Sequence, residues 1–187
     1  VLRFNTKEKK KMNEKKIIAF LIIIISIGLL LRIFSALTLN VVADDMHFAP
    51  HAINIISSGK LETYDQSAPL WFYITDFFYK VFGISQFTSR LSGILFGTLT
   101  IFVIFIFASY LFDSKKIGLL AALLFAISPF LSDSMRAEMD STVVFFILTN
   151  LYFLYKGANE NSNFYFILSF ISLGIAILLK IYAVLFI

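Results

Sequence analysis

The stretch from Leu91 to Phe112 contains no charged residue. A helix of about 20 apolar residues is long enough to cross the hydrocarbon core of a bilayer. A second uncharged run, Ile17 to Leu31, continues as apolar sequence beyond Arg32 to about Leu39. Hydrophobic residues make up 59% of the 187 positions and charged residues 15%, a balance typical of multi-span membrane proteins and unlike soluble domains. The sequence therefore predicts an all-α integral membrane protein.

The hydropathy pattern predicts about five transmembrane helices, at residues 17–39, 88–112, 117–132, 141–155 and 164–187. An outer loop at residues 40–87 is predicted to hold two amphipathic interfacial helices, 46–58 and 69–82, because aromatic side chains favour the headgroup level. Pro50 fits the first turn of a helix, so the first of these is expected to begin near Phe48. The third and fourth spans are short, which predicts that residues 133–140 lie in a recess.

Residues 1–16 carry far more Lys and Arg than Asp and Glu. A basic tail before an apolar helix is typical of a cytoplasmic N-terminus, so we expect a multi-pass protein of the cell membrane. A cleaved signal peptide is the alternative for residues 1–37, but the apolar run is too long for one. Outside the tail the charges nearly balance, which argues against nucleic acid as a partner. The chain has no cysteine, which excludes disulfides and thiolate metal sites.

Asp44 and Asp45 stand together where the first predicted span gives way to a predicted helix. One or both carboxylates would stabilise that helix as N-terminal caps. Alternatively, a carboxylate that faces a membrane cleft serves as a general base. His47 and His51 lie four apart on one helical face, and a structural or substrate hydrogen-bonding role for His51 is preferred to zinc binding.

A second charged cluster comprises Arg136, Glu138 and Asp140. Glu138 and Asp140 would share a divalent cation if the loop is extended, or the cluster is a hydrated salt bridge. Three basic residues, Arg32, Arg90 and Lys180, lie at or near the outer ends of predicted spans. They would either extend toward lipid headgroups or hold an anionic phosphate.

The order of these features resembles the GT-C membrane glycosyltransferases, in the branch of the protein O-mannosyltransferases and the aminoarabinose transferase of lipid A. The likeness covers residues 28–182. It includes "VVADDMHFA", a "PLWFY" stretch, an Arg-Leu pair at Arg90, an "SPF" block that leads to Asp140, and "LLK" ending at Lys180. The chain departs from the family pattern in having Asp-Asp where Asp-Glu is usual, and Ile-Tyr after Lys180 where Gly-Pro is usual.

The resemblance implies transfer of a sugar from a polyprenyl-phosphate donor to an acceptor hydroxyl of a protein, lipid or glycan, with inversion and on the extracytoplasmic side. It implies Asp44 as general base, with Asp45 as second choice. Asp140, also counted as catalytic, would with Glu138 orient the acceptor or share the role of the base. The basic residues Arg136, Arg90 and Lys180 would hold the lipid phosphate. Relatives in this superfamily have further spans and a soluble domain, so we expect this chain to be the N-terminal part of such a fold.

Three alternatives remain open at the sequence level. An oligosaccharyltransferase-like enzyme would use a divalent cation at Glu138 and Asp140. A transporter or flippase would show paired half-repeats and broken mid-membrane helices, which the sequence does not display. A non-catalytic membrane assembly subunit or remnant would use the same charges for assembly.

Overall fold

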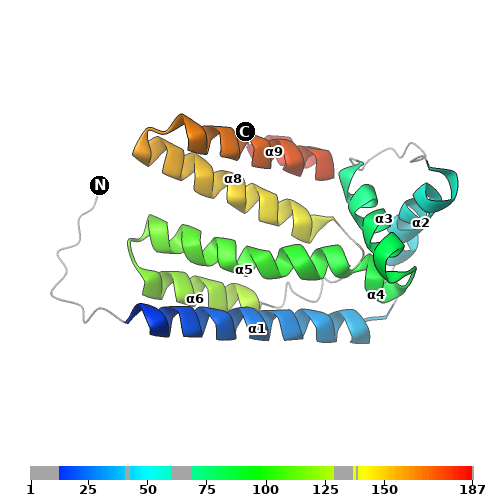
Figure 1. Ribbon diagram of the computed structural model, residues 1–187, viewed down its shortest axis with the longest axis horizontal. Coiled ribbons are helices and arrows are strands. Elements are labelled where there is room, and N and C mark those ends of the chain that lie inside the picture. The colour runs from blue at the N-terminus through cyan, green and yellow to red at the C-terminus, as the bar shows by residue number, and fades with distance from the viewer. Residues whose placement is uncertain (1–12, 41–42, 60–68, 129–136, 138, 187) are drawn as a thin grey trace.

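The computed structural model describes residues 13–40, 43–59, 69–128, 137 and 139–186, and all regular structure in these ranges is helical. Five helices, α1, α5, α6, α8 and α9, run side by side along the long axis, while α2, α3 and α4 gather at one end (Figure 1). We call this the α2–α4 end. The other end of the molecule, where α1 begins, is called the opposite end. The bounds are α1 Glu14–Thr38, α2 Ala43–Ser58, α3 Leu70–Phe82, α4 Gln86–Ser89, α5 Leu91–Leu111, α6 Lys115–Ala126, α8 Asp140–Glu160, α9 Asn163–Leu179 and the 3₁₀ helix η1 Ile181–Phe186.

Among the described residues, three helical segments are long and apolar enough to cross a membrane: Glu14–Thr38, Gln86–Leu111 and Asp140–Glu160. The helix Asn163–Leu179 is apolar but shorter. The third predicted span, 117–132, corresponds to α6, which has 12 residues and ends at Ala126. A helix of that length is about 18 Å long, too short to cross the hydrocarbon core.

Three predicted boundaries are wrong. α2 begins at Ala43, ahead of the predicted start near Phe48, and keeps Pro50 within the helix. α8 continues to Glu160, where the sequence predicted an end at residue 155, and the chain turns at Asn161 with φ 50°. The last predicted span ends early, because α9 stops at Leu179 and Lys180 is extended. Most of the predicted recess at residues 133–140 lies outside the described residues.

Small residues let the helices pack closely. A Cβ at Gly118 of α6 would lie 2.6 Å from the Phe105 carbonyl oxygen of α5, so only glycine allows this approach. Between α8 and α9 the Ser169 hydroxyl donates to the Asn150 Oδ1, 2.5 Å away. Hydrogen bonds of this kind join neighbouring helices where water is absent.

The largest apolar cluster lies where α2 and α3 pack on the ends of α8 and α9. Trp71 and Phe72 of α3 are fully buried in it, with Val143 of α8 and Leu179 of α9. The Trp71 indole N–H donates to the Ser92 hydroxyl of α5 at 3.2 Å, which satisfies the buried ring nitrogen. The α2–α4 end is therefore a packed layer that fixes the short helices on the bundle.

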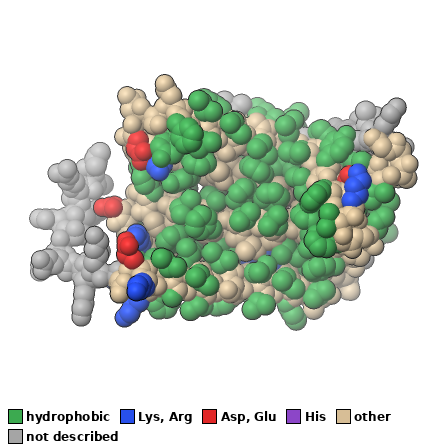
Figure 2. Space-filling model, viewed as in Figure 1, with side chains coloured by type: hydrophobic (Ala, Val, Ile, Leu, Met, Phe, Trp, Pro, Cys, Tyr) green, Lys and Arg blue, Asp and Glu red, His purple; other side chains and the backbone are tan. Residues whose placement is uncertain are grey.

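The exposed charged side chains of the described residues lie near the two ends of the molecule (Figure 2). On the visible face, hydrophobic side chains cover the middle, and acidic and basic side chains lie near both ends (Figure 2). At the opposite end Lys115 contacts Glu14 at 2.9 Å, and Lys156 lies 4.3 Å from the Tyr165 ring centroid. This distribution is that of a protein whose middle band faces lipid and whose ends reach the headgroups.

Candidate active site

Arg90 and Asp45 form a buried ion pair at the α2–α4 end. Arg90, at the junction of α4 and α5, donates from Nη2 to Asp45 Oδ2 at 2.7 Å and from Nε to Oδ1 at 3.3 Å. The two side chains are 0% and 4% exposed. Two parallel hydrogen bonds of this type fix the carboxylate in direction as well as in position.

The same guanidinium also binds the last turn of α1. Arg90 Nη1 donates to the carbonyl oxygens of Ala36 and Leu39, at 2.7 and 3.0 Å, and Nη2 donates to that of Asn40 at 3.2 Å. The last carbonyls of a helix have no intrahelical partners, and they favour a cation beside them. Arg90 thus ties the end of α1 to α2 and α5.

Asp45 accepts a third hydrogen bond, from the connection before α8. The backbone N–H of Ala137 donates to Asp45 Oδ1 at 2.8 Å, and Ala137 is fully buried. One carboxylate therefore joins segments that are far apart in the sequence. Both of its oxygens accept hydrogen bonds within the protein.

Tyr79 of α3 lies in the electrostatic field of this ion pair. Burial raises the pKa of the Tyr79 phenol above its ordinary value of 10.0; hydrogen bonding with Ser89 opposes that rise, and the Asp45 charge adds to it. Tyr79 is 3% exposed. The phenol therefore stays neutral beside the carboxylate.

A second ion pair lies at the same end of the molecule, between the start of α8 and the end of α9. Lys180 Nζ is 2.7 Å from Asp140 Oδ1, and the Tyr182 hydroxyl donates to the same oxygen at 2.7 Å. The side chains of Lys180 and Asp140 are 28% and 32% exposed, so solvent reaches both. Asp140 is the first residue of α8, where the helix dipole favours a negative charge.

The remaining predicted site residues divide into two groups. Asp44 lies in α2 directly before Asp45, but its side chain, with Arg136 and Glu138, lies outside the described part of the chain. His51 is half-buried on α2, with its ring 5.9 Å from that of Phe72 and edge-on to it. The structure thus brings together Asp45 with Arg90, and Asp140 with Lys180, at one end of the bundle.

The predicted cation site rests on Glu138 and Asp140, and Glu138 is not described. In the ranges that the structure does describe, no three His, Asp or Glu side chains gather as a metal site would require. The divalent cation therefore remains a prediction.

Arg32 does not extend to the headgroups, so that sequence interpretation is wrong. Its side chain is 1% exposed inside the α1–α5–α6 contact, with Nη1 donating to the Gly28 carbonyl at 3.0 Å. The guanidinium carbon lies 5.6 Å from the centroid of the Phe125 ring, and Nε has no hydrogen-bond acceptor among the described residues. Gly97 on α5 makes room for it, because a Cβ there would lie 2.7 Å from Nε.

Sequence reasoning missed two partners in these clusters. Tyr182 stands two residues after Lys180, at a position where the resemblance led us to expect a different residue. Ala137 contributes only its backbone N–H. No sequence pattern predicts which backbone N–H will donate to a side chain.

Three comparisons with known proteins show what this chain is similar to. The family model for dolichyl-phosphate-mannose-protein mannosyltransferase matches residues 66–187. A protein of Aquifex aeolicus (strain VF5), described as uncharacterized, is 28% identical over 171 residues, which cover 86% of this chain and 34% of that protein.

Among solved structures, the chain is similar to the crystal structure of ArnT from Cupriavidus metallidurans bound to undecaprenyl phosphate. The TM-score is 0.70 at 20% identity, over 87% of this chain and 32% of that one. The chain thus spans about a third of the length of each of these relatives. The fold likeness confirms the GT-C architecture that the sequence predicted, and the family match extends over more than half of the chain. This chain belongs to the dolichyl-phosphate-mannose-protein mannosyltransferase family, whose members are GT-C membrane glycosyltransferases.

Proposed function

We propose that this chain forms the acceptor-activating part of an enzyme that moves a sugar from a polyprenyl-phosphate donor to an acceptor hydroxyl. The observation that carries the proposal is the Arg90–Asp45 ion pair, which anchors the start of α2 at the same end as Asp140 and Lys180. The family match, and the undecaprenyl phosphate bound to ArnT, support the choice of donor.

Asp44 is the proposed general base. Asp45 already accepts hydrogen bonds on both oxygens, from Arg90 and from Ala137, and so serves to hold the site. We therefore assign proton transfer to Asp44, its neighbour in the sequence. In a single displacement with inversion, Asp44 takes the acceptor hydroxyl proton while the hydroxyl oxygen bonds to the anomeric carbon.

The bond that breaks joins the anomeric carbon to the donor phosphate oxygen. A phosphate leaving group is a weak base, so positive charge helps it more than a proton does. Lys180 is a described cation that is partly open to solvent at this end, and we assign it to the lipid phosphate together with Arg136. Arg90 is excluded from that task because its donors are already used by Asp45 and the end of α1.

Asp140 is proposed to orient the acceptor, with Glu138 beside it in the sequence. Its carboxylate is partly exposed at the amino end of α8, and one of its oxygens accepts from both Lys180 and Tyr182. A bound phosphate would compete with Asp140 for Lys180. Asp140 would then keep its hydrogen bond from Tyr182 and be able to accept one from the acceptor hydroxyl. The orientation of the site is part of the proposal: a basic tail at residues 1–16 in the cytoplasm puts the α2–α4 end outside.

The donor assignment is tested with protein purified from membranes and a radiolabelled sugar. Transfer from a polyprenyl-phosphate sugar, and none from the corresponding nucleotide sugar, is the expected result. Equal transfer from both donors, or transfer from the nucleotide sugar alone, would refute the proposed donor class.

A further inference from the structure

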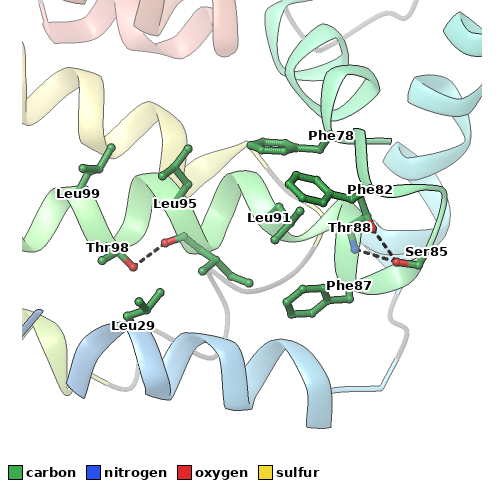
Figure 3. A pocket seen from close by; sticks show the side chains of 11 residues that line it. Leu29, Phe78, Phe82, Ser85, Phe87, Thr88, Leu91, Leu95, Thr98 and Leu99 are labelled. Carbon is green, nitrogen blue, oxygen red and sulfur yellow. Dashed lines mark hydrogen bonds between the residues drawn. The ribbon is translucent and has the colours of Figure 1, made fainter. Parts of the chain in front are cut away.

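An apolar groove lies on the side of the bundle between α1 and α5, under α3 and α4. Its volume is about 600 Å³. Leu29 of α1 lies on the Thr98 side of α5, Leu95 and Leu99 lie along the other side of that helix, and Phe78, Phe82 and Phe87 line the groove at the α2–α4 end (Figure 3). The groove is large enough for a small ligand and is built almost entirely of hydrocarbon.

The few hydroxyls in its wall are already satisfied. Thr98 donates to the Ile94 carbonyl at 2.7 Å, and the Ser85 and Thr88 hydroxyls are 2.8 Å apart. The Ser85 oxygen also accepts from the Thr88 backbone N–H at 3.1 Å. These hydroxyls already have hydrogen-bond partners within the protein. The lining therefore favours a hydrocarbon chain over a polar ligand.

The groove has a fixed roof. α3 ends at Phe82, and Gly83, with φ 81°, reverses the chain into α4, which Ser85 caps. That positive φ favours glycine, since other L-residues are strained there. One turn of α3 brings the Phe78 and Phe82 rings together, 6.4 Å apart and stacked, over the start of α5 (Figure 3).

The mouth of the groove is continuous with the lipid-facing surface. Leu95 and Leu99 are 45% and 40% exposed on α5, and Phe82 is 66% exposed on the roof. α1 and α5 are two of the helices long enough to cross the membrane, so the groove opens at the depth of lipid chains. Water would find too few hydrogen-bond partners in so apolar a space. An empty groove would leave its lining side chains without van der Waals contacts on one side.

We propose that this groove binds one acyl chain of a bilayer phospholipid, held between α1 and α5 as a structural lipid. The lining comes from α1, α3, α4 and α5, whereas Asp140 and Lys180 lie on α8 and after α9. The groove therefore shares no lining residue with the pair to which we assign the donor phosphate. The occupant is therefore a phospholipid and not the polyprenyl donor.

The test uses two matched double substitutions. Leu95→Phe with Leu99→Phe fills the groove, and Leu120→Phe with Leu124→Phe adds the same bulk at the same spacing on exposed positions of α6, which do not line it. Native mass spectrometry of protein released from mild detergent counts and weighs the retained lipid. The wild type and the α6 variant are expected to retain one phospholipid, and the groove variant none.

A fluorescence measurement checks the location. Trp71 is the only tryptophan, and its partner Ser92 is next to the groove residue Leu91. In vesicles of phosphatidylcholine with a dibrominated acyl chain, Trp71 emission is expected to be quenched in the wild type and at least twofold less in the groove variant. Phe82→Ala, which opens the roof without adding bulk, is expected to lose the lipid as well.

Three outcomes would overturn the proposal. They are equal lipid retention by the two double variants, a retained mass that is polyprenyl phosphate, or a wild-type protein that retains no lipid. Circular dichroism of each variant ensures that loss of lipid is scored only on folded protein.

Discussion

Arg90 and Asp45 are 45 residues apart in the sequence, and they meet in a two-point ion pair that is closed to solvent. The pair joins the end of α1, the start of α2 and the start of α5 through one guanidinium. The proposed role of Asp44 as general base depends on this ion pair. The pair fixes the start of α2, where Asp44 directly precedes Asp45.

Breaking the pair from one side is expected to be costly. Arg90→Leu leaves the Asp45 carboxylate buried without the cation that it pairs with, and a loss of about 3–5 kcal/mol in the free energy of unfolding is expected. Thermal unfolding in detergent micelles measures it. The double variant with Asp45→Leu is expected to lose less than either single variant, since no charge is left unpaired.

The exposed pair of Glu14 and Lys115 supplies the control. Their side chains are 80% and 54% exposed, so Glu14→Gln is expected to change stability by less than about 1 kcal/mol. A comparable loss of unfolding free energy in Arg90→Leu and Glu14→Gln would contradict this prediction. Burial would then not make the Arg90–Asp45 pair more important for stability than an exposed pair.

Lys180→Ala is expected to separate stability from activity. The Lys180–Asp140 pair is partly exposed, so its loss should cost less than about 1 kcal/mol of unfolding free energy. If Lys180 holds the donor phosphate, sugar transfer falls by at least tenfold, through KM for the donor or through kcat. Unchanged kinetics in the folded variant would remove Lys180 from the site.

Gly97→Ala is expected to destabilise the contact between α1 and α5. The added methyl would lie 2.7 Å from Arg32 Nε, so either the guanidinium or the helix must move, at a cost of about 1–3 kcal/mol. Gly174→Ala on α9 is the matched control, because a Cβ there meets nothing within 4 Å and helix propensity favours alanine. Equal unfolding temperatures for the two variants would contradict the close packing around Arg32.

The pH dependence of stability should report Tyr79. Its folded-state pKa lies above the ordinary 10.0, so the unfolded phenol ionises first as pH rises. The stabilisation is fully present below pH 10 and is lost as pH rises through the folded pKa. Tyr79→Phe is expected to reduce the fall in unfolding temperature at high pH relative to the wild type. Identical pH profiles of the wild type and Tyr79→Phe would argue against the buried phenol.

The sequence alone was sufficient to predict the helices that consist of one long apolar run. The uncharged runs predicted α1 and α5 to within a few residues, because each must satisfy its backbone within one segment in lipid. Asp45, Arg90 and Lys180, which the sequence singled out near span ends, all enter ion pairs.

Predictions failed where contacts outweigh local preference. Pro50 suggested a later start for α2, yet Asp45 is held from outside by Arg90, and the helix extends back to Ala43. The polar residues after Tyr155 suggested an end to α8, yet Lys156 lies over tyrosine rings and within 3.9 Å of Glu160, and helix continues. Pairings across 40 or more residues depend on how helices pack, which periodicity does not encode.

The most direct test of the proposed mechanism is the rate of sugar transfer by Asp44→Asn. The control is Asp113→Asn, the same chemical change at an exposed turn residue with φ 47° at the opposite end, a conformation that asparagine also adopts. Both are measured with saturating polyprenyl-phosphate sugar and acceptor. The account predicts that kcat falls by about 10²–10⁴-fold in Asp44→Asn and is unchanged in Asp113→Asn. Transfer by folded Asp44→Asn at the wild-type rate would contradict it.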